Sequence, residues 1–270
     1  MKNVITLYKK EGETPLECMD RFRAQNPQYQ HVSLTYAGRL DPLACGKLLV
    51  LAGDMVHKKE EYCACDKEYY VEALLGLQTD TYDVLGIPQN YKNRTTQELS
   101  AQGRQDFPKE DVVQALGFFI EKKEQPYPPY SSRTVNGKPM WQWAREGRLD
   151  EIEIPTREVE IYAISDVETR EITQQEILDR VNTITRLVTG DFRQDEIRNA
   201  WHYRAGSRIS SSLRLENSGM TEMLVSFHVK CSSGTYIRTL VHELGKKLGV
   251  GACIFRLERT RVIIEENFPQ

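Results

Sequence analysis

Residues 36–46, YAGRLDPLACG, place a single aspartate, Asp41, between a leucine and a proline. Gly38 and Gly46 flank this aspartate, and the apolar run LLVLAG follows at residues 48–53. A carboxylate on a tight loop that leads into a core segment suits a catalytic nucleophile. It also suits a turn, because aspartate bonds to its own backbone and the position before proline disfavours helix. The loop alone leaves both interpretations open.

The whole chain has the composition of a water-soluble globular protein. Its 270 residues are 40% apolar and 28% charged, which is ordinary for a folded domain with one large core. No apolar run approaches the roughly 20 residues that span a bilayer, and residues 1–10 lack the apolar block of a signal peptide. We therefore expect a cytoplasmic protein that does not bind membranes.

The cysteine and histidine patterns do not predict a metal site. Six cysteines are scattered along the chain, and the closest two, Cys63 and Cys65, are not matched by a second such pair. His242 and Glu243 precede Leu-Gly-Lys, so the second histidine of a metalloprotease helix is missing. We expect reduced, mostly buried thiols and no metal.

The charge balance argues mildly against a protein that coats nucleic acid. The net charge is −3 and the isoelectric point is about 6.0, whereas phosphate neutralisation needs clustered lysine and arginine. A local basic groove remains compatible with this balance. Two clusters stand out, each by default a solvated face: Arg133, Lys138, Arg145 and Arg148, and then Arg256, Arg259 and Arg261.

Hydrophobic periodicity divides the chain into strands and separate helices. Asn136-Gly137 is typical of a hairpin turn, and residues 90–105 have the composition of a hydrophilic loop. We predict an α+β fold, in which helices flank a mixed, largely antiparallel sheet. The expected strands are residues 3–8, 67–76, 152–163 and 223–231, and the expected helices are residues 15–23, 109–121, 140–145 and 235–248.

Residues 165–222 differ in texture from their surroundings and predict an inserted helical subdomain. Thr173 and Glu176 can form a capping box, and a second helix is expected around residues 192–201. The arginines of this segment could contact RNA, or the helix pair could simply cover the sheet. With this insertion, we expect residues 1–270 to form a single domain.

Four stretches of the chain carry a more specific pattern: AGRLDPLACGKLLVLAG (37–53), DKEYYVEALLGLQTDTYDVLG (66–86), YSSRTVNGKPMWQWAREG (130–147) and CSSGTYIRTLVHELGKKLGVGA (231–252). Together they resemble the TruB family of RNA pseudouridine synthases, which includes the catalytic subunits of box H/ACA guided enzymes. Their order and spacing fit as well, so the resemblance covers most of the chain outside residues 165–222. One G-x-L-D-P motif is a weak signal, whereas four ordered blocks are a strong one.

The resemblance implies a pseudouridine synthase catalytic fold and an isomerase that converts uridine to pseudouridine in RNA without cofactor or metal. A uridine stacked in a folded RNA must be flipped into a pocket before an enzyme can reach it. Asp41 would then act as the nucleophile, or stabilise the intermediate of glycosidic cleavage, while the freed uracil rotates and bonds again through C5. The resemblance leaves both roles open.

The resemblance also implies partners for Asp41. Tyr69 matches the tyrosine that stacks on the flipped base, and Tyr70 points to the other face of the strand. Arg238 matches the arginine that pairs with the aspartate, and a bidentate guanidinium would keep that carboxylate ionised and oriented. Without the resemblance, Tyr69 would be a core tyrosine and Arg238 a surface arginine. The predicted catalytic residues are thus Asp41, Tyr69 and Arg238, and the predicted substrate-binding residues are Lys9, Tyr36, Gly38, Arg39, Tyr236 and Leu257.

Three features depart from the family pattern. Tyr36 stands where a histidine usually helps to displace the target nucleotide, and tyrosine can stack or wedge but cannot become a cationic imidazole. Lys9 keeps the family lysine, but Lys10 replaces the proline that follows it. Family members usually continue into a PUA or related RNA-binding module, and the sequence after Arg261 is too short for one. We therefore expect the catalytic domain to hold its substrate by itself.

The leading functional hypothesis is an RNA pseudouridine synthase that acts on the T-stem loop of tRNA, the usual target of standalone family members. The choice of tRNA rests on analogy alone. Tyr36 motivates an alternative, an RNA-binding chaperone or assembly factor with weak or no synthase activity. A third hypothesis makes residues 165–222 a docking surface for proteins or a guide RNA. We expect a monomer whose insertion leaves a protein partner open.

Overall fold

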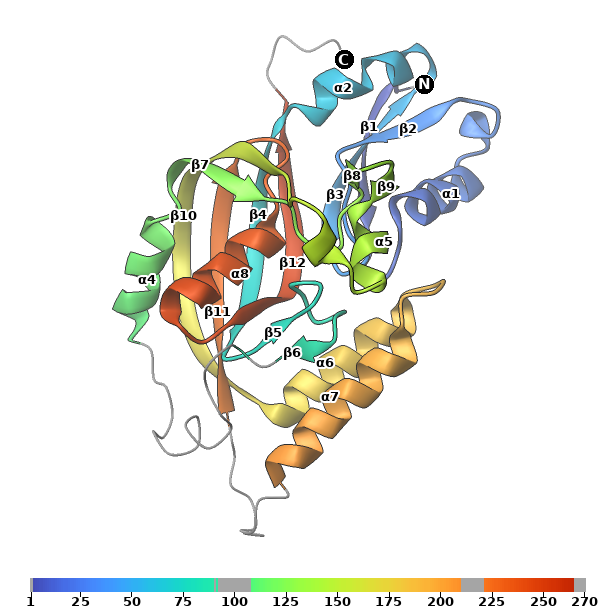
Figure 1. The fold of residues 1–270 in the computed structure, drawn as a ribbon. Helices are drawn as coiled ribbons and strands as arrows, with labels where there is room; N and C mark the ends of the chain where they lie inside the picture. The colour runs from blue at the N-terminus through green and yellow to red at the C-terminus, as the bar shows by residue number, and fades with distance from the viewer. Residues whose placement is uncertain (1, 90, 92–107, 210–220, 265–270) are drawn as a thin grey trace.

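The structure is a computed structural model that describes residues 2–89, 91, 108–209 and 221–264. The hydrophilic loop predicted at residues 90–105 lies outside the described residues, apart from Tyr91. A mixed sheet of eight strands forms the centre (Figure 1), in the order β1-β3-β12-β4-β11-β10-β7, with β2 also paired to β3. Its strands are β1 (Val4–Lys9), β2 (Leu34–Ala37), β3 (Cys45–Ala52), β4 (Asp66–Leu75), β7 (Glu121–Pro126), β10 (Thr156–Thr173), β11 (Thr221–Cys231) and β12 (Ala252–Ile263).

The pairings of this sheet are antiparallel, except for the parallel contact between β3 and β12. Helix α8 packs on β12, and α4 packs on both β10 and α8, so these two helices cover the same side of the sheet (Figure 1). The predicted α+β class is therefore confirmed. The helices are α1 (Pro15–Gln25), α2 (Lys59–Cys63), α4 (Lys109–Gly117), α5 (Met140–Arg145), α6 (Gln174–Leu187), α7 (Gln194–Ile209) and α8 (Ile237–Leu248).

Local sequence signals set several helix ends, among them the capping box predicted at Thr173 and Glu176. Thr14 and Glu17 form a capping box at the start of α1, and Thr173 and Glu176 form another at the start of α6. Gly249 ends α8 in the left-handed conformation. Among the described helices, none combines the length and apolar character needed to cross a membrane.

Residues 127–151 form an arm that stands on the α8 side of the sheet (Figure 1). Strands β8 (Thr134–Val135) and β9 (Lys138–Pro139) pair across the predicted Asn136-Gly137 turn, and α5 follows directly. Both turn residues have positive φ, as a two-residue hairpin of this kind requires. A second small pair, β5 (Gln78–Thr79) with β6 (Pro88–Gln89), lies between the arm and α7.

The predicted subdomain boundary at residue 165 is wrong, because strand β10 continues to Thr173. This part of β10 pairs with β11 as far as the Thr173–Thr221 pair, so backbone hydrogen bonds to a distant segment extend the strand. Its side chains are mostly polar and exposed, which hid the strand from hydrophobic periodicity. The helices form a hairpin of α6 and α7, residues 174–209, that we call the helical insertion.

The helical insertion packs against the main core. Ile177, Val181, Ile184, Ile197 and Trp201 are buried in the same apolar cluster as the central strands. The indole Nε1 of Trp201 also donates a hydrogen bond of 3.0 Å to the carbonyl of Gly86, near β6. The helix pair therefore covers the molecule with an apolar face, as one of the two interpretations expected.

Strands β3 and β12 meet at one short contact, where Gly46 lies opposite Arg259. Gly46 has φ +108°, a backbone conformation that residues with a side chain rarely adopt. A Cβ here would lie 2.3 Å from the carbonyl oxygen of Arg259 and 2.8 Å from its amide nitrogen. Since both are backbone atoms, no side-chain rotation relieves the clash. The contact therefore requires glycine.

We predict that Gly46→Ala lowers the free energy of unfolding by roughly 2–5 kcal/mol, through backbone strain and overpacking. Gly53→Ala is the matched control, because Gly53 also has positive φ, +62°, but no atom lies within 4 Å of the added Cβ. It should cost about 1 kcal/mol. Urea unfolding followed by circular dichroism measures both losses, and equal losses would contradict the steric explanation.

Candidate active site

The loop that carries Asp41 joins β2 to β3 and is held from below by buried side chains. Leu40 and Leu43, on either side of the Asp41-Pro42 pair, are buried in the main core. The amide of Gly12 donates to the carbonyl of Pro42 at 2.9 Å. The Asp41 side chain is 34% exposed, so its carboxylate lies at the surface of a loop whose neighbours are anchored.

Arg238, in the first turn of α8, connects this loop to two other segments. Its Nε donates to Oδ2 of Asp41 at 2.8 Å, its Nη1 to the carbonyl of Thr81 at 2.9 Å, and its Nη2 to the carbonyl of Tyr130 at 3.1 Å. The predicted bidentate pair is therefore wrong: one nitrogen serves the carboxylate, because backbone carbonyls take the others. In the part of the chain that the structure describes, Oδ1 of Asp41 accepts no hydrogen bond.

A second carboxylate, missed at the sequence level, lies beside Arg238. Asp83 is buried, with Oδ2 at 4.0 Å from the Nε of Arg238. Burial raises the pKa of Asp83 to about 6, although Arg238 and hydrogen bonds from the Thr81 hydroxyl and the Leu85 amide act in the opposite direction. Its sequence, TDTYD at 79–83, has the composition of a polar turn, and nothing in that pattern signals burial.

The charges around Arg238 keep it protonated. Burial alone would lower the pKa of the guanidinium, but the carboxylates of Asp41 and Asp83 raise it above its ordinary value. The start of α8 is fixed as well, because the Gln125 side chain accepts from the amide of Tyr236 at 2.8 Å and donates to its carbonyl at 3.1 Å. A permanent positive charge is therefore held rigidly beside Asp41.

A row of paired residues crosses the sheet beneath the Asp41 loop. Lys9 on β1 pairs with Gly46 on β3, Gly46 with Arg259 on β12, and Arg259 with Tyr69 on β4. Because directly paired residues point to the same face, Lys9, Arg259 and Tyr69 lie on one side. The strand register thus brings together residues that are 250 positions apart in the sequence.

Lys9 is fully buried under the loop. Its ammonium donates to the carbonyl of Ala44 at 2.5 Å and to that of Lys10 at 3.1 Å. Burial lowers the pKa of Lys9 to about 8, although the charge of Asp41 acts to raise it. Lys9 therefore contacts the backbone of the Asp41 loop rather than open solvent.

Arg259 holds the other end of the same loop. Its guanidinium donates to the carbonyls of Lys47 at 2.7 Å, Gly38 at 3.1 Å and Arg39 at 3.4 Å. The prediction of a solvated basic face is wrong for this residue, which is 1% exposed. The sequence did carry a signal for this burial. Leu257 and Arg259 are two positions apart in a strand, so their side chains point to the same face, and Leu257 is a core residue.

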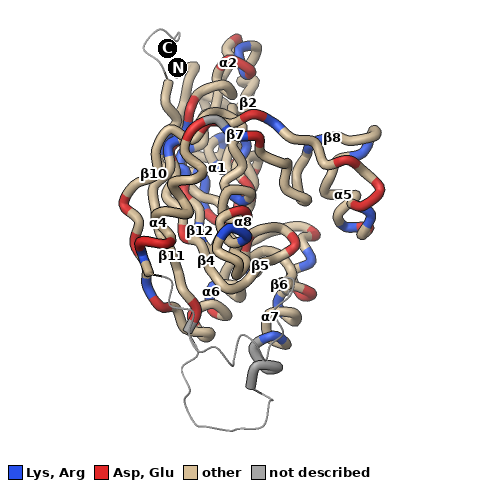
Figure 2. The backbone as a smooth tube through the Cα atoms, turned by 60° about the vertical axis from the view of Figure 1, so that its left-hand side comes forward, with Lys and Arg blue, Asp and Glu red and all other residues tan. Residues whose placement is uncertain are grey.

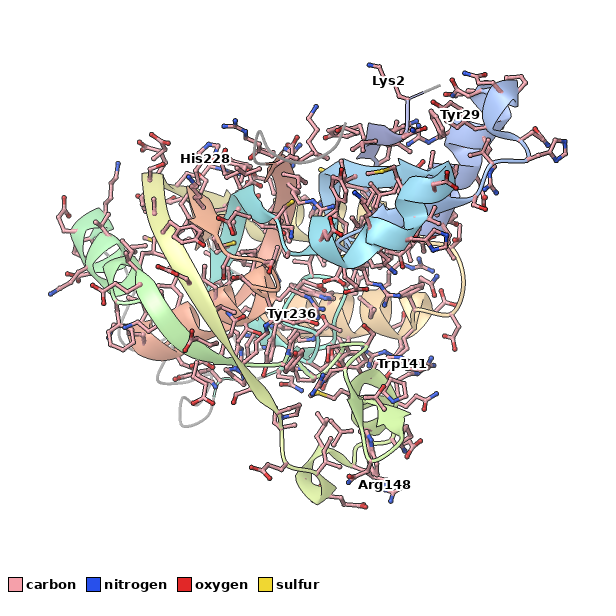
Figure 3. The ribbon with its side chains drawn as sticks, turned by 90° about the horizontal axis from the view of Figure 1, so that it is seen from above. Lys2, Tyr29, Trp141, Arg148, His228 and Tyr236 are labelled. Carbon is pink, nitrogen blue, oxygen red and sulfur yellow. The ribbon has the colours of Figure 1, made fainter. Side chains whose placement is uncertain are left out.

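Tyr69 is buried, and Tyr70 faces the other side as predicted, where its ring lies 5.3 Å from that of His228. Burial raises the pKa of Tyr69 to about 12, so its hydroxyl stays protonated at neutral pH. Leu257 is buried in the same apolar cluster. In Figure 3, His228 and Tyr236 lie on opposite sides of the sheet.

Tyr236 and Tyr36 occupy different surroundings. Tyr236 is half-buried, its ring meets that of Tyr127 edge-on at 5.4 Å, and its pKa is raised by burial and by the charge of Asp41. Tyr36 packs on the smaller cluster between α1 and the sheet. Its hydroxyl accepts a long 3.5 Å contact from Arg39, and the ammonium of Lys59 lies 5.5 Å from its ring centroid. Tyr36 is itself uncharged, but two cationic side chains, Arg39 and Lys59, lie beside it.

The expected absence of a bound metal stays a prediction. Within the described ranges, no three His, Cys, Asp or Glu side chains gather closely enough to hold a metal ion. None of the six cysteines is in a disulfide, and five of them are buried. The arrangement around Asp41 offers a carboxylate, a guanidinium and aromatic rings, which suits acid–base or nucleophilic chemistry on a flat, uncharged group.

The family model for "TruB family pseudouridylate synthase (N terminal domain)" matches residues 28–185, which is more than half of the chain and includes Asp41 and Tyr69. The chain belongs to the TruB family. The resemblance that rests on the four sequence blocks is thereby confirmed, and the match extends into the first helix of the helical insertion.

Curated members of the TruB family align along most of the chain. The tRNA pseudouridine synthase B of Thermosipho melanesiensis is 28% identical over 262 residues, which are 97% of this chain and 64% of that protein. The enzyme of the same name from Thermotoga maritima is 26% identical over 267 residues, which are 98% of this chain and 65% of that protein. The chain thus spans less than two thirds of the length of these relatives.

A solved structure supports the TruB-type fold. The protein in "Crystal Structure of a Cbf5-Nop10-Gar1 Complex" superposes with a TM-score of 0.53 at 20% identity. The superposition covers 96% of this chain and 48% of that one. At this identity the likeness establishes the shared fold.

Asp83 gives this TruB-family chain a testable pH dependence. The pKa of its carboxyl is about 6 in the folded protein, compared with an ordinary value of 3.8. Folding therefore favours the protonated form, and the stability from this group is complete below about pH 4 and is lost as the pH rises to about 6. Relative to Asp83→Asn, the wild-type protein should lose about 3 kcal/mol of unfolding free energy over that interval.

Urea unfolding of both proteins at matched pH values checks this expectation. Asparagine is the suitable comparison, because its amide oxygen can still accept from Thr81 and Leu85 while its charge does not change with pH. A stability difference between the two proteins that stays constant from pH 4 to 7 would contradict burial of an ionising carboxyl.

Proposed function

We propose that this chain converts uridine to pseudouridine in RNA, with the T-stem loop of tRNA as its substrate. One observation carries the proposal: Arg238 holds one oxygen of the Asp41 carboxylate, and the other oxygen accepts no hydrogen bond from the described residues. Membership of the TruB family supports the reaction, and relatives named tRNA pseudouridine synthase B support the substrate.

The chemistry is an isomerisation that needs an ionised carboxylate. The bond between the sugar C1′ and the base N1 breaks, a bond from C1′ to C5 forms, and one hydrogen leaves C5 while N1 gains one. Asp41 can attack during this exchange or stabilise the positive charge that develops when the glycosidic bond breaks. Both routes require Asp41 to carry its charge, and the guanidinium of Arg238 donates to that carboxylate at 2.8 Å.

Aromatic and apolar side chains near Asp41 suit a flipped base. Tyr69 offers a ring on the buried face, Tyr236 a half-buried ring at the start of α8, and Leu257 an apolar wall. A base that leaves its stack regains contact energy from such surfaces. We assign stacking on the base to Tyr69, and lining of the pocket to Tyr236 and Leu257.

The loop residues receive supporting and contacting roles. Lys9 is buried beneath the loop, and the carbonyl of Gly38 accepts from Arg259, so these two positions hold the backbone that presents Asp41. Tyr36 and Arg39 lie together nearer the surface. We assign them contact with the RNA next to the target, where a ring can wedge and a guanidinium can bind phosphate.

The arm offers a surface for the rest of the RNA. Figure 3 shows Trp141 and Arg148 on the arm, which projects from the side of the sheet where Tyr236 lies. Trp141 is 39% exposed, and Lys138 and Arg148 both lie over the ring of Trp143. Acidic residues are interspersed along the arm (Figure 2), so its basic residues bind phosphate in competition with internal ion pairs.

The other expectations remain part of the proposal. A tRNA substrate suits a cytoplasmic enzyme, and the chemistry described for Asp41 uses neither metal nor cofactor. The helical insertion covers the core on one side, so a single copy of the chain can form the site. We therefore propose a monomer in which the insertion acts within the chain.

We predict that Asp41→Asn slows pseudouridine formation at least ~10³-fold and changes tRNA affinity only a few-fold, because the amide keeps the shape but loses the charge. Asp54→Asn, at an exposed position, is the matched control and should behave like the wild type. Incubation with unmodified tRNA and detection of carbodiimide-adducted pseudouridine measures the product, and filter binding measures affinity. Full turnover by Asp41→Asn ends the proposal, and tight binding without any product from the wild type favours an RNA chaperone.

The role of Tyr69 can be divided between its ring and its hydroxyl. Tyr69→Phe keeps the ring, whereas Tyr69→Leu keeps apolar volume without an aromatic face. If stacking is the main contribution, we expect kcat/KM to be roughly 10–100-fold lower for the leucine variant than for the phenylalanine variant. Single-turnover assays on tRNA compare the two, and equal losses in both variants would assign the role to the hydroxyl.

A further inference from the structure

The connection between the two helices of the helical insertion contacts three segments near the candidate active site. Thr189 bonds to Glu17 at the start of α1, and Asp191 forms an ion pair of 2.8 Å with Arg145 on α5. Arg193 reaches past both, to the turn after β5. In Figure 1, this end of the α6–α7 pair lies below α1 and α5.

Arg193 forms a largely buried ion pair there. Its Nη1 donates to Oδ2 of Asp80 at 2.8 Å, and the two side chains are only 15% and 17% exposed. The guanidinium also lies over the ring of Tyr130, 4.7 Å from the centroid. Arg193 itself has a φ of +59°, a left-handed conformation that a non-glycine residue rarely adopts. The tertiary contacts therefore hold this residue in an uncommon conformation.

Asp80 joins Arg193 to two other segments. Its Oδ2 also accepts from the Tyr130 hydroxyl at 3.1 Å, and its Oδ1 accepts from the amide of Ile87 at 2.8 Å. Burial raises the pKa of Tyr130 to about 12, which keeps its hydroxyl a donor. A carboxylate this enclosed needs the cation, since an uncompensated buried charge is strongly unfavourable.

The cluster of Arg193, Asp80 and Tyr130 is connected to Arg238 by a direct hydrogen bond. The carbonyl of Tyr130 accepts from Nη2 of Arg238, and the carbonyl of Thr81, the residue after Asp80, accepts from Nη1. Both backbone acceptors that orient Arg238 thus belong to segments that Asp80 ties together. If these segments separate, the Nε that holds Asp41 loses its fixed direction.

We propose that the helical insertion positions the guanidinium of Arg238, with Arg193 as the positioning residue that fixes Asp80 and Tyr130. The inference rests on the proposed function and deepens it, because it assigns the insertion to the reaction step rather than to RNA binding or partner docking. Arg193 is not available to RNA phosphates, since Asp80 and the Tyr130 ring occupy its guanidinium.

The insertion stays attached to the molecule by other means. Its apolar face is buried in the main core, and Arg180 on α6 forms two hydrogen bonds with Glu11, at 2.7 and 2.8 Å, and a third with the carbonyl of Phe255. Removing Arg193 therefore loosens the tip of the insertion and the two segments that it touches, and leaves the helices docked.

The test compares Arg193→Met with Tyr130→Phe, which removes only the hydroxyl that Asp80 accepts and keeps the carbonyl that Arg238 uses. Both variants should lower kcat on unmodified tRNA by 10- to 100-fold, with KM and tRNA affinity within about threefold of wild type. The double variant should be no slower than the slower single variant, because both changes break one linkage. Arg193→Lys, which keeps the charge but loses the planar fork, should recover part of kcat.

Arg170→Met is the matched control. Arg170 forms an ion pair with Glu176 at the opposite end of the insertion and has no contact with Asp80. It should retain the wild-type kcat. A wild-type kcat in Arg193→Met, or equal losses in Arg193→Met and Arg170→Met, overturns the inference.

Amide hydrogen exchange separates this inference from the proposed function. Arg193→Met should speed exchange at least fivefold in peptides that cover residues 79–87 and 127–133, whereas Arg170→Met should not. If the wild type makes no pseudouridine but this pattern appears, the proposed function fails while the linkage stands. If the wild type is active and exchange in both peptides is unchanged, the linkage is overturned. Tyr130→Phe decides the same question should Arg193→Met fold poorly.

Discussion

The guanidinium of Arg238 is the group on which the arrangement of this site depends. It is buried, and each of its three nitrogens donates to a different segment: the Asp41 loop, the turn after β5 and the arm. A buried cation is tolerated only when its donors are paired and compensating charge is near. Asp41 and Asp83 provide that charge, so the same contacts that make Arg238 tolerable also bring the segments together.

The two buried arginines near Asp41 contact different parts of its loop. Arg238 contacts the carboxylate, whereas Arg259 donates to the backbone carbonyls of Gly38 and Arg39 in the loop and of Lys47 on β3. The first fixes the direction of the Asp41 side chain, and the second fixes the path of the backbone beneath it. Lys9 adds a third buried cation on the carbonyl of Ala44. The loop is therefore rigid on its inner side, while the carboxylate remains accessible to substrate.

The helical insertion extends this support outward. It enters between the paired strands β10 and β11, and its tip meets Asp80, next to the carbonyl that Arg238 uses. An insertion between paired strands leaves the sheet register intact, which is why a helix pair can be accommodated here without disturbing the row from Lys9 to Tyr69. It packs on the rest of the protein through an apolar face and through largely buried ion pairs such as Arg193 with Asp80.

The sequence by itself determined the local features of this protein: the capping boxes, the Asn136-Gly137 turn, the alternation around Tyr69 and the ordered blocks that single out Asp41 and Arg238. These signals depend on neighbours within a few residues, or on motifs that are contiguous in the chain. Only the tertiary structure decided the burial of Asp83, the single hydrogen bond from Arg238 to Asp41, the full length of β10 and the pairing of Arg193 with Asp80. Each of these depends on which distant segment lies opposite, and strand register and the exclusion of water settle that only once the chain has folded.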